Sequence, residues 1–291
     1  MLKWSKEKLV FAHDLFKLED QVANILSFFV GAILAFGGIP DLSVNLLYGL
    51  VAVAGALLGI NLFNQITDIE IDRINKPHRP LPNGKVSTQT ALNIVIFLFL
   101  VSLLSAYIFS IVLFGLTLAY LILGTAYSLK PFRLKERFLL SNFSIAIWYN
   151  FLNFLMGWVV FRPLLDAPFA LLTLWFIYDF IAINSKDYFD INGDGQFGVK
   201  TLPVLFGVDK ALKIDYFSQV LTQLVFAVLV FTGFLPFYIL AFNVVTLAVT
   251  SWLFLHVCKT HNFMRFYNLS FGMHIIFRIL ILILFFSGLY V

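Results

Sequence analysis

The sequence predicts an all-α, polytopic membrane protein, and three observations lead to that fold class. The 291-residue chain is 60% hydrophobic and only 12% charged, whereas a soluble domain carries about 25% charged residues. Its apolar residues form continuous runs of about 20, the length of a membrane-spanning helix, without the period-two alternation of a β-barrel. Its single cysteine, Cys258, excludes an intrachain disulfide scaffold. This composition also excludes a soluble cytosolic enzyme and a disordered chain.

The first 20 residues are polar and mixed in charge, unlike the rest of the chain. The apolar run behind them has no small-residue cleavage site, so we expect no cleaved signal peptide. We predict that residues 1–20 form an arm on the membrane surface and that residues 21–291 form a single transmembrane domain of nine helices. The nine apolar runs lie near residues 21–38, 43–64, 91–109, 110–129, 139–160, 167–186, 212–232, 235–256 and 270–290.

Positive charge predicts the orientation of these runs. Of the 20 Lys and Arg residues, eighteen fall in the N-terminal arm or in the segments that follow the second, fourth, sixth and eighth runs. Cytoplasmic loops collect Lys and Arg, so we expect the N-terminus in the cytoplasm and the C-terminus outside. Most acidic residues lie in the same loops, and we therefore expect the active site at the cytoplasmic face.

Two apolar runs end in regularly spaced polar motifs. Asn64, Asp68 and Asp72 follow one another at intervals of four residues, a spacing that keeps side chains on one face of an α-helix. A second motif closes the sixth run, in which Asp190 and Asp194 are again four residues apart and Asp187 lies one turn earlier.

These acidic motifs indicate a metal-assisted diphosphate site. Like charges four residues apart destabilise a helix unless something neutralises them. Mg²⁺ prefers carboxylate oxygens, keeps several waters and is commonly completed by substrate phosphates. Two such clusters on one side of the membrane predict two Mg²⁺ ions and a diphosphate. In the alternative interpretation the acids only pair with nearby Lys and Arg on a solvated face, and the second copy of the motif argues against it.

Polar groups near the motifs are the candidates for binding a diphosphate. They lie at helix ends or in the predicted cytoplasmic loops, next to an acidic motif. Ordinary positive-inside charge and interfacial tyrosine are the competing explanations. The candidates are Asn64, Arg73, Arg79, Tyr127, Lys130, Arg133 and Lys135.

Polar residues are also predicted at membrane depth. Asn150 in the fifth run is a candidate for the wall of an acceptor site, with an interhelical hydrogen bond as the alternative. Arg278 in the ninth run is expected to pair with Asp179 or Asp215, because a charge at this depth is costly without a partner.

Together these residues resemble a known family. The motifs NxxxDxxxD and DxxDxxxD, with the flanking stretches NKPHRPLPNG, YSLKPFRLK and GVKTLPVLFG, resemble the UbiA superfamily of intramembrane prenyltransferases. The nine-run layout is similar as well, so the resemblance covers nearly the whole chain. It implies a nine-helix bundle with a central cavity that opens sideways to lipid.

The resemblance also implies a reaction and residue roles. Such enzymes use Mg²⁺ to move an isoprenyl group from a polyprenyl diphosphate, such as geranylgeranyl diphosphate, to a lipophilic acceptor. Carried over residue by residue, Asn64, Asp68 and Asp72 would hold one metal ion, and Asp190 and Asp194 the other. The remaining aspartate of the second motif would assist or act on the acceptor. The catalytic residues so implied are Asp68, Asp72, Asp187, Asp190 and Asp194.

The expected partners are a prenyl diphosphate, a small aromatic or lipid acceptor and membrane lipid, with no nucleic acid. An aromatic quinone precursor is the leading acceptor, because NQxxDxxxDxxNKP is similar to homogentisate-type enzymes and such acceptors are commonest in the superfamily. RPLPNG and KTLPV are more similar to enzymes that prenylate geranylgeranylglyceryl phosphate for ether lipids, which is the alternative. Asn192 stands where both groups often have an acidic residue.

Two other functions compete with prenyl transfer. A transporter is compatible with a repeated helical motif, although the charged site of a transporter normally lies near the bilayer midplane and these acids lie at one face. A terpene cyclase would carry the same metal motifs, and only its product would distinguish it.

Overall fold

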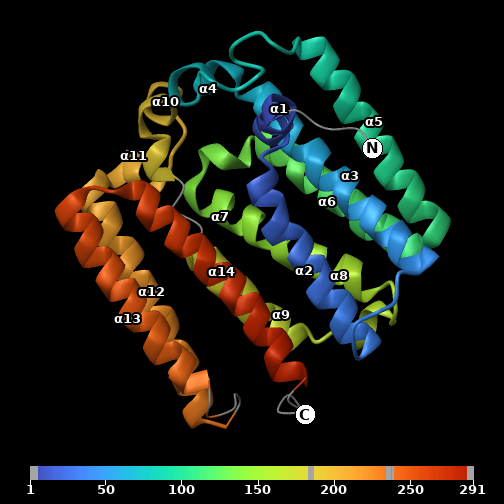
Figure 1. Cartoon of the computed structure of the whole chain (residues 1–291). Coiled ribbons are helices and arrows are strands. Elements are labelled where there is room, and N and C mark those ends of the chain that lie inside the picture. The colour runs from blue at the N-terminus through green and yellow to red at the C-terminus, as the bar shows by residue number, and fades with distance from the viewer. Residues whose placement is uncertain (1–5, 183–186, 234–236, 238, 287–291) are drawn as a thin grey trace. The chain divides into compact units, whose positions relative to one another are not determined.

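The computed structural model describes residues 6–182, 187–233, 237 and 239–286, and within these ranges it contains helices, turns and no strands. The all-α prediction is therefore confirmed for the described residues (Figure 1). Two compact units are present. Unit 1 comprises residues 1–135 and 147–169, and unit 2 comprises residues 136–146 and 170–291. The separate arm at residues 1–20 stays a prediction.

Unit 1 combines the N-terminal helices with one later segment. In this segment η2 is a single π-helical stretch, an irregular turn often found at functional sites. The helices of unit 1 are α1 (Lys6–Phe16), α2 (Leu18–Phe36), α3 (Val44–Thr67), α4 (Ile69–Asn75), α5 (Thr88–Phe109), α6 (Ile111–Ser128), η1 (Leu134–Glu136), η2 (Ile147–Leu152), α8 (Asn153–Trp158) and η3 (Leu164–Asp166).

Three helices of unit 1 begin at serine caps. Ser43, Ser87 and Ser110 have extended backbone conformations, and each side-chain oxygen accepts a hydrogen bond from the backbone N–H three residues later. Such a cap satisfies one of the N–H groups that a helix start leaves without a partner. The serines thereby fix where α3, α5 and α6 begin. Ser110 also marks where two nearly continuous apolar runs divide.

Helices α2 and α8 pack through glycine. A Cβ added to Gly157 would lie 1.9 Å from the carbonyl oxygen of Phe28, and one added to Gly31 would lie 2.1 Å from that of Phe154. No larger residue fits at either position without moving backbone. Close approach of this kind is typical of helix packing in membranes, where small residues bring backbones together.

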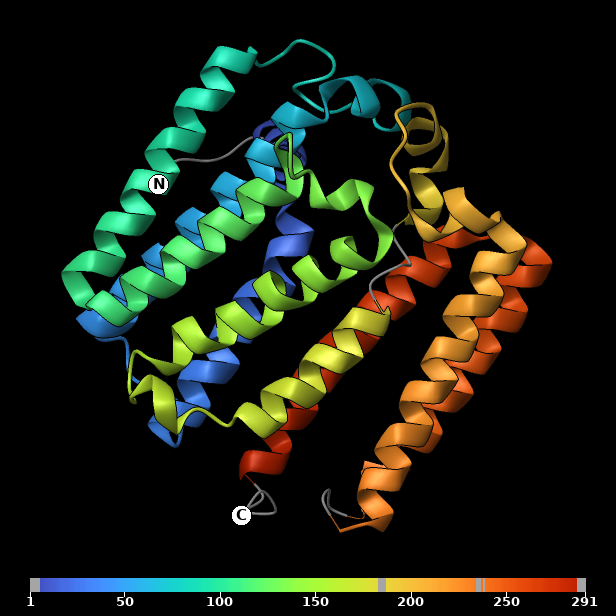
Figure 2. The ribbon, with the colours of Figure 1, turned by 180° about the vertical axis from the view of Figure 1, so that it is seen from behind.

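Hydroxyl groups join α3 to α5, which lie side by side in both views of the ribbon (Figures 1 and 2). The hydroxyl of Ser102 donates to the carbonyl oxygen of Ala52 at 2.5 Å, and that of Ser105 to the carbonyl oxygen of Tyr48 at 2.9 Å. These interhelical bonds satisfy polar groups that would otherwise be stranded in an apolar environment.

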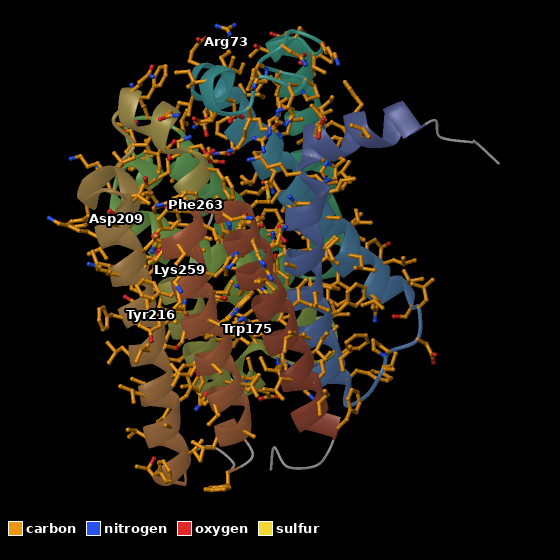
Figure 3. All side chains as sticks on the ribbon, turned by 60° about the vertical axis from the view of Figure 1, so that its left-hand side comes forward. Arg73, Trp175, Asp209, Tyr216, Lys259 and Phe263 are labelled. Atoms are coloured by element: carbon orange, nitrogen blue, oxygen red, sulfur yellow. The ribbon has the colours of Figure 1, made fainter. Side chains whose placement is uncertain are left out.

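Unit 2 contains the C-terminal helices, of which α12 and α13 run alongside each other (Figure 2). Tyr216 on α12 joins them, because its ring stacks on Phe254 with centroids 4.4 Å apart and its hydroxyl lies 3.1 Å from Oγ of Ser251 (Figure 3). The helices of unit 2 are α7 (Phe138–Ala146), α9 (Phe169–Ala182), α10 (Ile191–Gln196), α11 (Leu202–Phe206), α12 (Val208–Phe231), α13 (Ile239–Thr260) and α14 (Phe263–Phe286).

Each of the nine predicted apolar runs overlaps a helix, or a consecutive set of helices, in the described chain. The count of nine membrane spans and the central cavity stay predictions. In the part of the chain that the structure describes, five helical stretches are long and apolar enough to cross a membrane, namely Val44–Thr67, Thr88–Phe109, Ile111–Ser128, Phe138–Trp158 and Val208–Phe231.

Candidate active site

The first acidic motif lies where α3 ends and α4 begins. The sequence predicts an unbroken helix here, but the helix is interrupted at Asp68, whose φ of −109° and ψ of 11° are not helical. Backbone hydrogen bonds continue across the interruption. The N–H of Asp68 donates to the carbonyl of Asn64 at 3.1 Å, and the N–H of Asp72 donates to the carbonyl of Asp68 at 2.7 Å. The expected four-residue register therefore survives the break.

The side chain of Asn64 is the hub of this motif. Its Nδ2 donates to Oδ2 of Asp68 at 3.1 Å and to Oγ of Ser128 at 2.9 Å. Its Oδ1 accepts from Nζ of Lys17 at 3.3 Å. These contacts orient the amide and connect the end of α3 to the end of α6 and to the junction between α1 and α2.

Three of the predicted cations lie at the carboxylates of this motif. The ammonium of Lys135 bonds to Oδ1 of Asp68, and a guanidinium nitrogen of Arg133 lies 3.7 Å from the same oxygen. The guanidinium of Arg79 lies 3.1 Å from Oδ2 of Asp72, whose side chain is buried. Pairing of this kind neutralises carboxylates that would otherwise repel one another.

Lys17 is a fourth cation at the motif, and the sequence analysis did not select it. It lies between α1 and α2 in a left-handed conformation, with φ of 49°, which is uncommon for a residue other than glycine. Two buried glutamines hold the junction. Gln21 donates to the carbonyls of Phe16 and Lys17 at 3.2 Å, and Gln65 donates to the carbonyl of Leu15 at 2.6 Å. The available signal was a lysine placed just before the first apolar run.

The other predicted diphosphate ligands have different surroundings. Tyr127 is buried, and its ring meets the ring of Trp148 edge-on with centroids 4.9 Å apart. Arg73 is exposed at the outer edge of α4, where its guanidinium bonds to both carboxylate oxygens of Glu70 at 2.7 Å (Figure 3). Lys130 is exposed as well. The structure therefore does not bring Arg73 or Lys130 into contact with the acids of the first motif.

Tyr127 belongs to an aromatic cluster within unit 1. Trp148 belongs to the π-helical stretch, and it stacks on Tyr120 with centroids 6.3 Å apart. Nearby, Asn150 accepts a hydrogen bond from the hydroxyl of Ser27 at 2.7 Å. The interhelical alternative for Asn150 is thus the one that the structure supports.

The second acidic motif belongs to unit 2 and is built on a turn and a short helix. Residues 187–189 form a 3-10 turn, Asp190 occupies the N-cap position of α10 without a capping hydrogen bond from its side chain, and Asp194 lies buried in the first turn of this helix. The N–H of Asp194 donates to the carbonyl of Asp190 at 2.9 Å, which preserves the expected spacing. Residues 183–186 lie outside the described residues, so the expected continuation from α9 is not described.

Tyr188 lies between the aspartates of this motif. Its hydroxyl donates to Oδ2 of Asp215 at 2.5 Å. Burial, and then the nearby Asp215 carboxylate, raise the pKa of Tyr188 far above its ordinary value, so the phenol remains a donor. Arg278, for which Asp215 was one expected partner, lies over the Trp175 ring with 5.5 Å to its centroid.

The first motif fits a hard divalent cation. It offers two carboxylates and an amide within two helical turns. Mg²⁺ prefers such oxygens and usually takes its remaining ligands from water and substrate phosphates. Within the described residues, no group of three or more His, Cys, Asp or Glu side chains that could hold a metal ion is found.

The apolar helices and the cations paired with the acidic side chains define the class as a helical membrane protein with a charged site at its helix ends. The chain belongs to the UbiA prenyltransferase family, which matches residues 24–276. It is accordingly an integral, multi-pass membrane protein and a prenyltransferase by class. The resemblance seen in the motifs is confirmed.

Named relatives agree with this assignment. The chain is 30% identical over 240 residues to digeranylgeranylglyceryl phosphate synthase of Sulfurisphaera tokodaii, covering 80% of each protein. It is 39% identical over 176 residues to homogentisate phytyltransferase of a Synechocystis strain, covering 57% of this chain and 56% of the relative. Its fold is similar to a UbiA homolog from Archaeoglobus fulgidus bound to DMAPP and Mg²⁺, with a TM-score of 0.68, 21% identity and coverage of 93% and 98% of the two chains.

Proposed function

We propose that this protein transfers an isoprenyl group from a polyprenyl diphosphate to geranylgeranylglyceryl phosphate and releases diphosphate. One observation carries the proposal, namely the excess of positive charge at the first motif. Four cationic side chains surround two carboxylates and one amide, so the group suits a multiply charged anion. The four cations are Lys17, Arg79, Arg133 and Lys135.

Two divalent cations, preferably Mg²⁺, complete the proposed site. Asn64, Asp68 and Asp72 would hold one ion, and Asp190 and Asp194 the other. When bound, such ions neutralise charge on the diphosphate as it leaves. The structure of the UbiA homolog from Archaeoglobus fulgidus holds both DMAPP and Mg²⁺, which supports this assignment.

The residues of the chain favour breakage of the bond between the allylic carbon and the diphosphate oxygen. Diphosphate departs with the bonding electron pair, and the cations Arg79, Arg133 and Lys135 stabilise the charge that it gains. The acceptor hydroxyl then forms a C–O bond with the allylic carbon, and we assign to the carboxylate of Asp187 the role of taking the proton that this hydroxyl loses. The faces of Tyr127 and Trp148 can shield and stabilise an electron-poor allylic group, as aromatic rings do for cations.

The relatives favour a glyceryl phosphate acceptor over the aromatic acceptor that led the sequence analysis. Several of them, from Sulfurisphaera, Sulfolobus and Thermococcus species, are named digeranylgeranylglyceryl phosphate synthase. The aromatic acceptor remains the second candidate because homogentisate phytyltransferase matches at 39% identity. We place the site at the cytoplasmic face, with the N-terminus in the cytoplasm, because the loops that carry it collect Lys and Arg.

Pyrophosphate release by the purified protein in nanodiscs tests this function. Geranylgeranyl diphosphate and Mg²⁺ are supplied with geranylgeranylglyceryl phosphate, homogentisate or 4-hydroxybenzoate in separate reactions. We expect the glyceryl phosphate alone to accelerate release and to give a prenylated product by mass spectrometry. Acceleration by an aromatic acceptor would select the second candidate. Release without an acceptor, with a hydrocarbon product, would identify a terpene cyclase, and no release would contradict prenyl transfer.

A further inference from the structure

The second acidic motif contains an anchor that is separate from its aspartates. Tyr188 follows Asp187 directly and precedes Asp190 by two residues, and its hydroxyl reaches Asp215 on α12 at 2.5 Å. Both side chains are buried, with exposed fractions of 4% and 7%. A short hydrogen bond to a carboxylate is among the stronger neutral-to-charged contacts in proteins, so this bond can hold the turn in place.

The ring of Tyr188 is fixed as well as its hydroxyl. It stacks on Phe263, at the start of α14, with centroids 5.3 Å apart and an angle of 4° between the planes. It belongs to an apolar cluster in which its buried partners are Leu202, Ala211, Leu212 and Val257. The turn at residues 187–189 is therefore attached through Tyr188 to α11, α12, α13 and α14.

Backbone hydrogen bonds carry this attachment into the motif. The N–H of Asp190 donates to the carbonyl of Asp187 at 3.3 Å, and the N–H of Asp194 donates to the carbonyl of Asp190 at 2.9 Å. The carbonyl of Asp194 in turn accepts from the N–H of Val199 at 2.9 Å. A displacement of the Tyr188 turn would therefore move both Asp190 and Asp194.

Burial of the Asp215 carboxylate costs free energy unless the carboxylate is hydrogen-bonded. The hydroxyl of Tyr188 supplies such a bond. Outer-shell partners that orient ligands commonly change metal affinity by about 10- to 100-fold when they are removed. The hydrogen-bonded pair of Tyr188 and Asp215 fixes the turn between Asp187 and Asp190, so it can orient these aspartates as an outer-shell partner does.

We propose that Tyr188 and Asp215 form a positioning pair that sets the spacing of Asp187, Asp190 and Asp194 for binding a divalent cation with diphosphate. This inference rests on the proposed function, since it assigns the ligand of the second motif. The pair does not touch the substrate. It acts through the aspartates and can be removed without changing any of them.

The test compares Tyr188→Phe with Tyr216→Phe in the full chain in nanodiscs. The control also removes one hydroxyl contact on α12, to Oγ of Ser251 at 3.1 Å, and it leaves the hydrogen bond between Tyr188 and Asp215 in place. Two quantities are measured: the Mg²⁺ concentration for half-maximal pyrophosphate release, and amide hydrogen exchange at residues 187–199 with and without Mg²⁺ and inorganic pyrophosphate. We expect Tyr188→Phe to raise the Mg²⁺ requirement about 10-fold and to weaken the protection conferred by Mg²⁺ and pyrophosphate, while the control resembles the wild type.

Two further variants separate positioning from folding. Asp215→Asn keeps an oxygen that accepts the Tyr188 hydrogen bond, and we expect it to stay near the wild-type Mg²⁺ requirement. The double variant Tyr188→Phe with Asp215→Leu leaves no buried charge, and replacing both partners is far less costly to stability than replacing one. We expect it to unfold near the wild-type temperature and still to need more Mg²⁺.

Unchanged Mg²⁺ requirement and unchanged exchange in both Tyr188→Phe and the double variant would overturn the positioning role. Equal effects in the Tyr216→Phe control would overturn it too. If the wild-type protein releases no pyrophosphate, the proposed function fails, whereas the exchange comparison with Mg²⁺ and pyrophosphate still decides whether Tyr188 orders this motif.

Discussion

The guanidinium of Arg79 lies 3.1 Å from Oδ2 of Asp72, seven residues earlier in the chain, and both side chains are largely buried. Arg73 is adjacent to Asp72 in the sequence and yet faces away, bonded to Glu70 at the surface. Adjacent residues on a helix point in directions about 100° apart. Arg73 is therefore the nearer of the two arginines to Asp72 in the sequence, whereas Arg79 is the one that contacts Asp72 in the structure.

This difference gives a matched pair of variants. We expect Arg79→Ala to lower kcat/KM for the prenyl diphosphate by at least about 10-fold, equivalent to about 1.4 kcal/mol, because a buried carboxylate loses its partner and the leaving group loses a cation. Arg73→Ala should change kcat/KM by less than about 2-fold, since exposed ion pairs contribute little. Steady-state kinetics measure both, and equal effects would contradict the assignment.

Asp68→Ala and Asp190→Ala should each reduce prenyl transfer by at least about 100-fold, more than the loss of an outer-shell contact. Each substitution removes a proposed metal ligand. We expect both variants to insert into membranes and Asp190→Ala to unfold near the wild-type temperature, whereas Asp68→Ala also leaves the buried Lys135 ammonium without its carboxylate and should unfold at a lower temperature. Retained turnover in both would rule out the two-ion arrangement.

Chelation offers a test that needs no mutation. EDTA should stop pyrophosphate release, and added Mg²⁺ should restore it, because open carboxylate sites of this kind exchange their metal with solvent. Zn²⁺ is a useful comparison, since it favours nitrogen and sulfur ligands. A reaction rate insensitive to EDTA would show that prenyl transfer does not depend on divalent cations bound at the acidic motifs.

Lys17→Met should raise the KM for the prenyl diphosphate with a smaller change in kcat. The substitution removes the ammonium at Asn64 and keeps an unbranched apolar stem. Lys17→Gly would relieve a left-handed conformation that costs about 1 kcal/mol, so it should be no less stable in thermal unfolding while showing the same defect in KM. Lys85→Met is the control, because Lys85 is exposed in the loop before α5. An unchanged KM in both Lys17 variants would leave this lysine without a role in substrate binding.

Gly157→Ala should destabilise unit 1 by about 1–3 kcal/mol, because the added Cβ would lie 1.9 Å from the carbonyl oxygen of Phe28. Gly115→Ala is a matched helical control with no atom within 4 Å of the added carbon. It should be neutral or gain up to about 1 kcal/mol from better helix propensity. Thermal unfolding in nanodiscs measures both, and similar behaviour would contradict the tight contact.

Hydrophobicity and spacing predicted the helical class and the places where helices occur, because these depend on local composition. The family followed from motif residues whose spacing survives in both acidic segments. The break at Asp68 could not be read from the spacing, since the same register is compatible with a continuous helix. The separate helix α10 likewise follows from backbone geometry that the acidic pattern does not encode.

Long-range pairing was the part that sequence reasoning missed. Lys17 reaches Asn64 across 47 residues, and Tyr188 reaches Asp215 across 27. Lys135 was selected because it follows α6 in a loop rich in cations, whereas Lys17 was assigned only to the arm. Whether a cation lies in the site or on the surface depends on the fold around it. For Lys17, the two glutamines that hold the α1–α2 junction place it in the site.

The backbone contact between α2 and α8 has a practical consequence. Hydrocarbon solvates an apolar helix as well as another helix does, so association inside a bilayer gains little from the release of water and depends on close fit. A fit made by Gly31 and Gly157 against main-chain atoms owes little to the identity of the surrounding lipid. Extraction from native membrane into a mild detergent should therefore preserve this pair of helices.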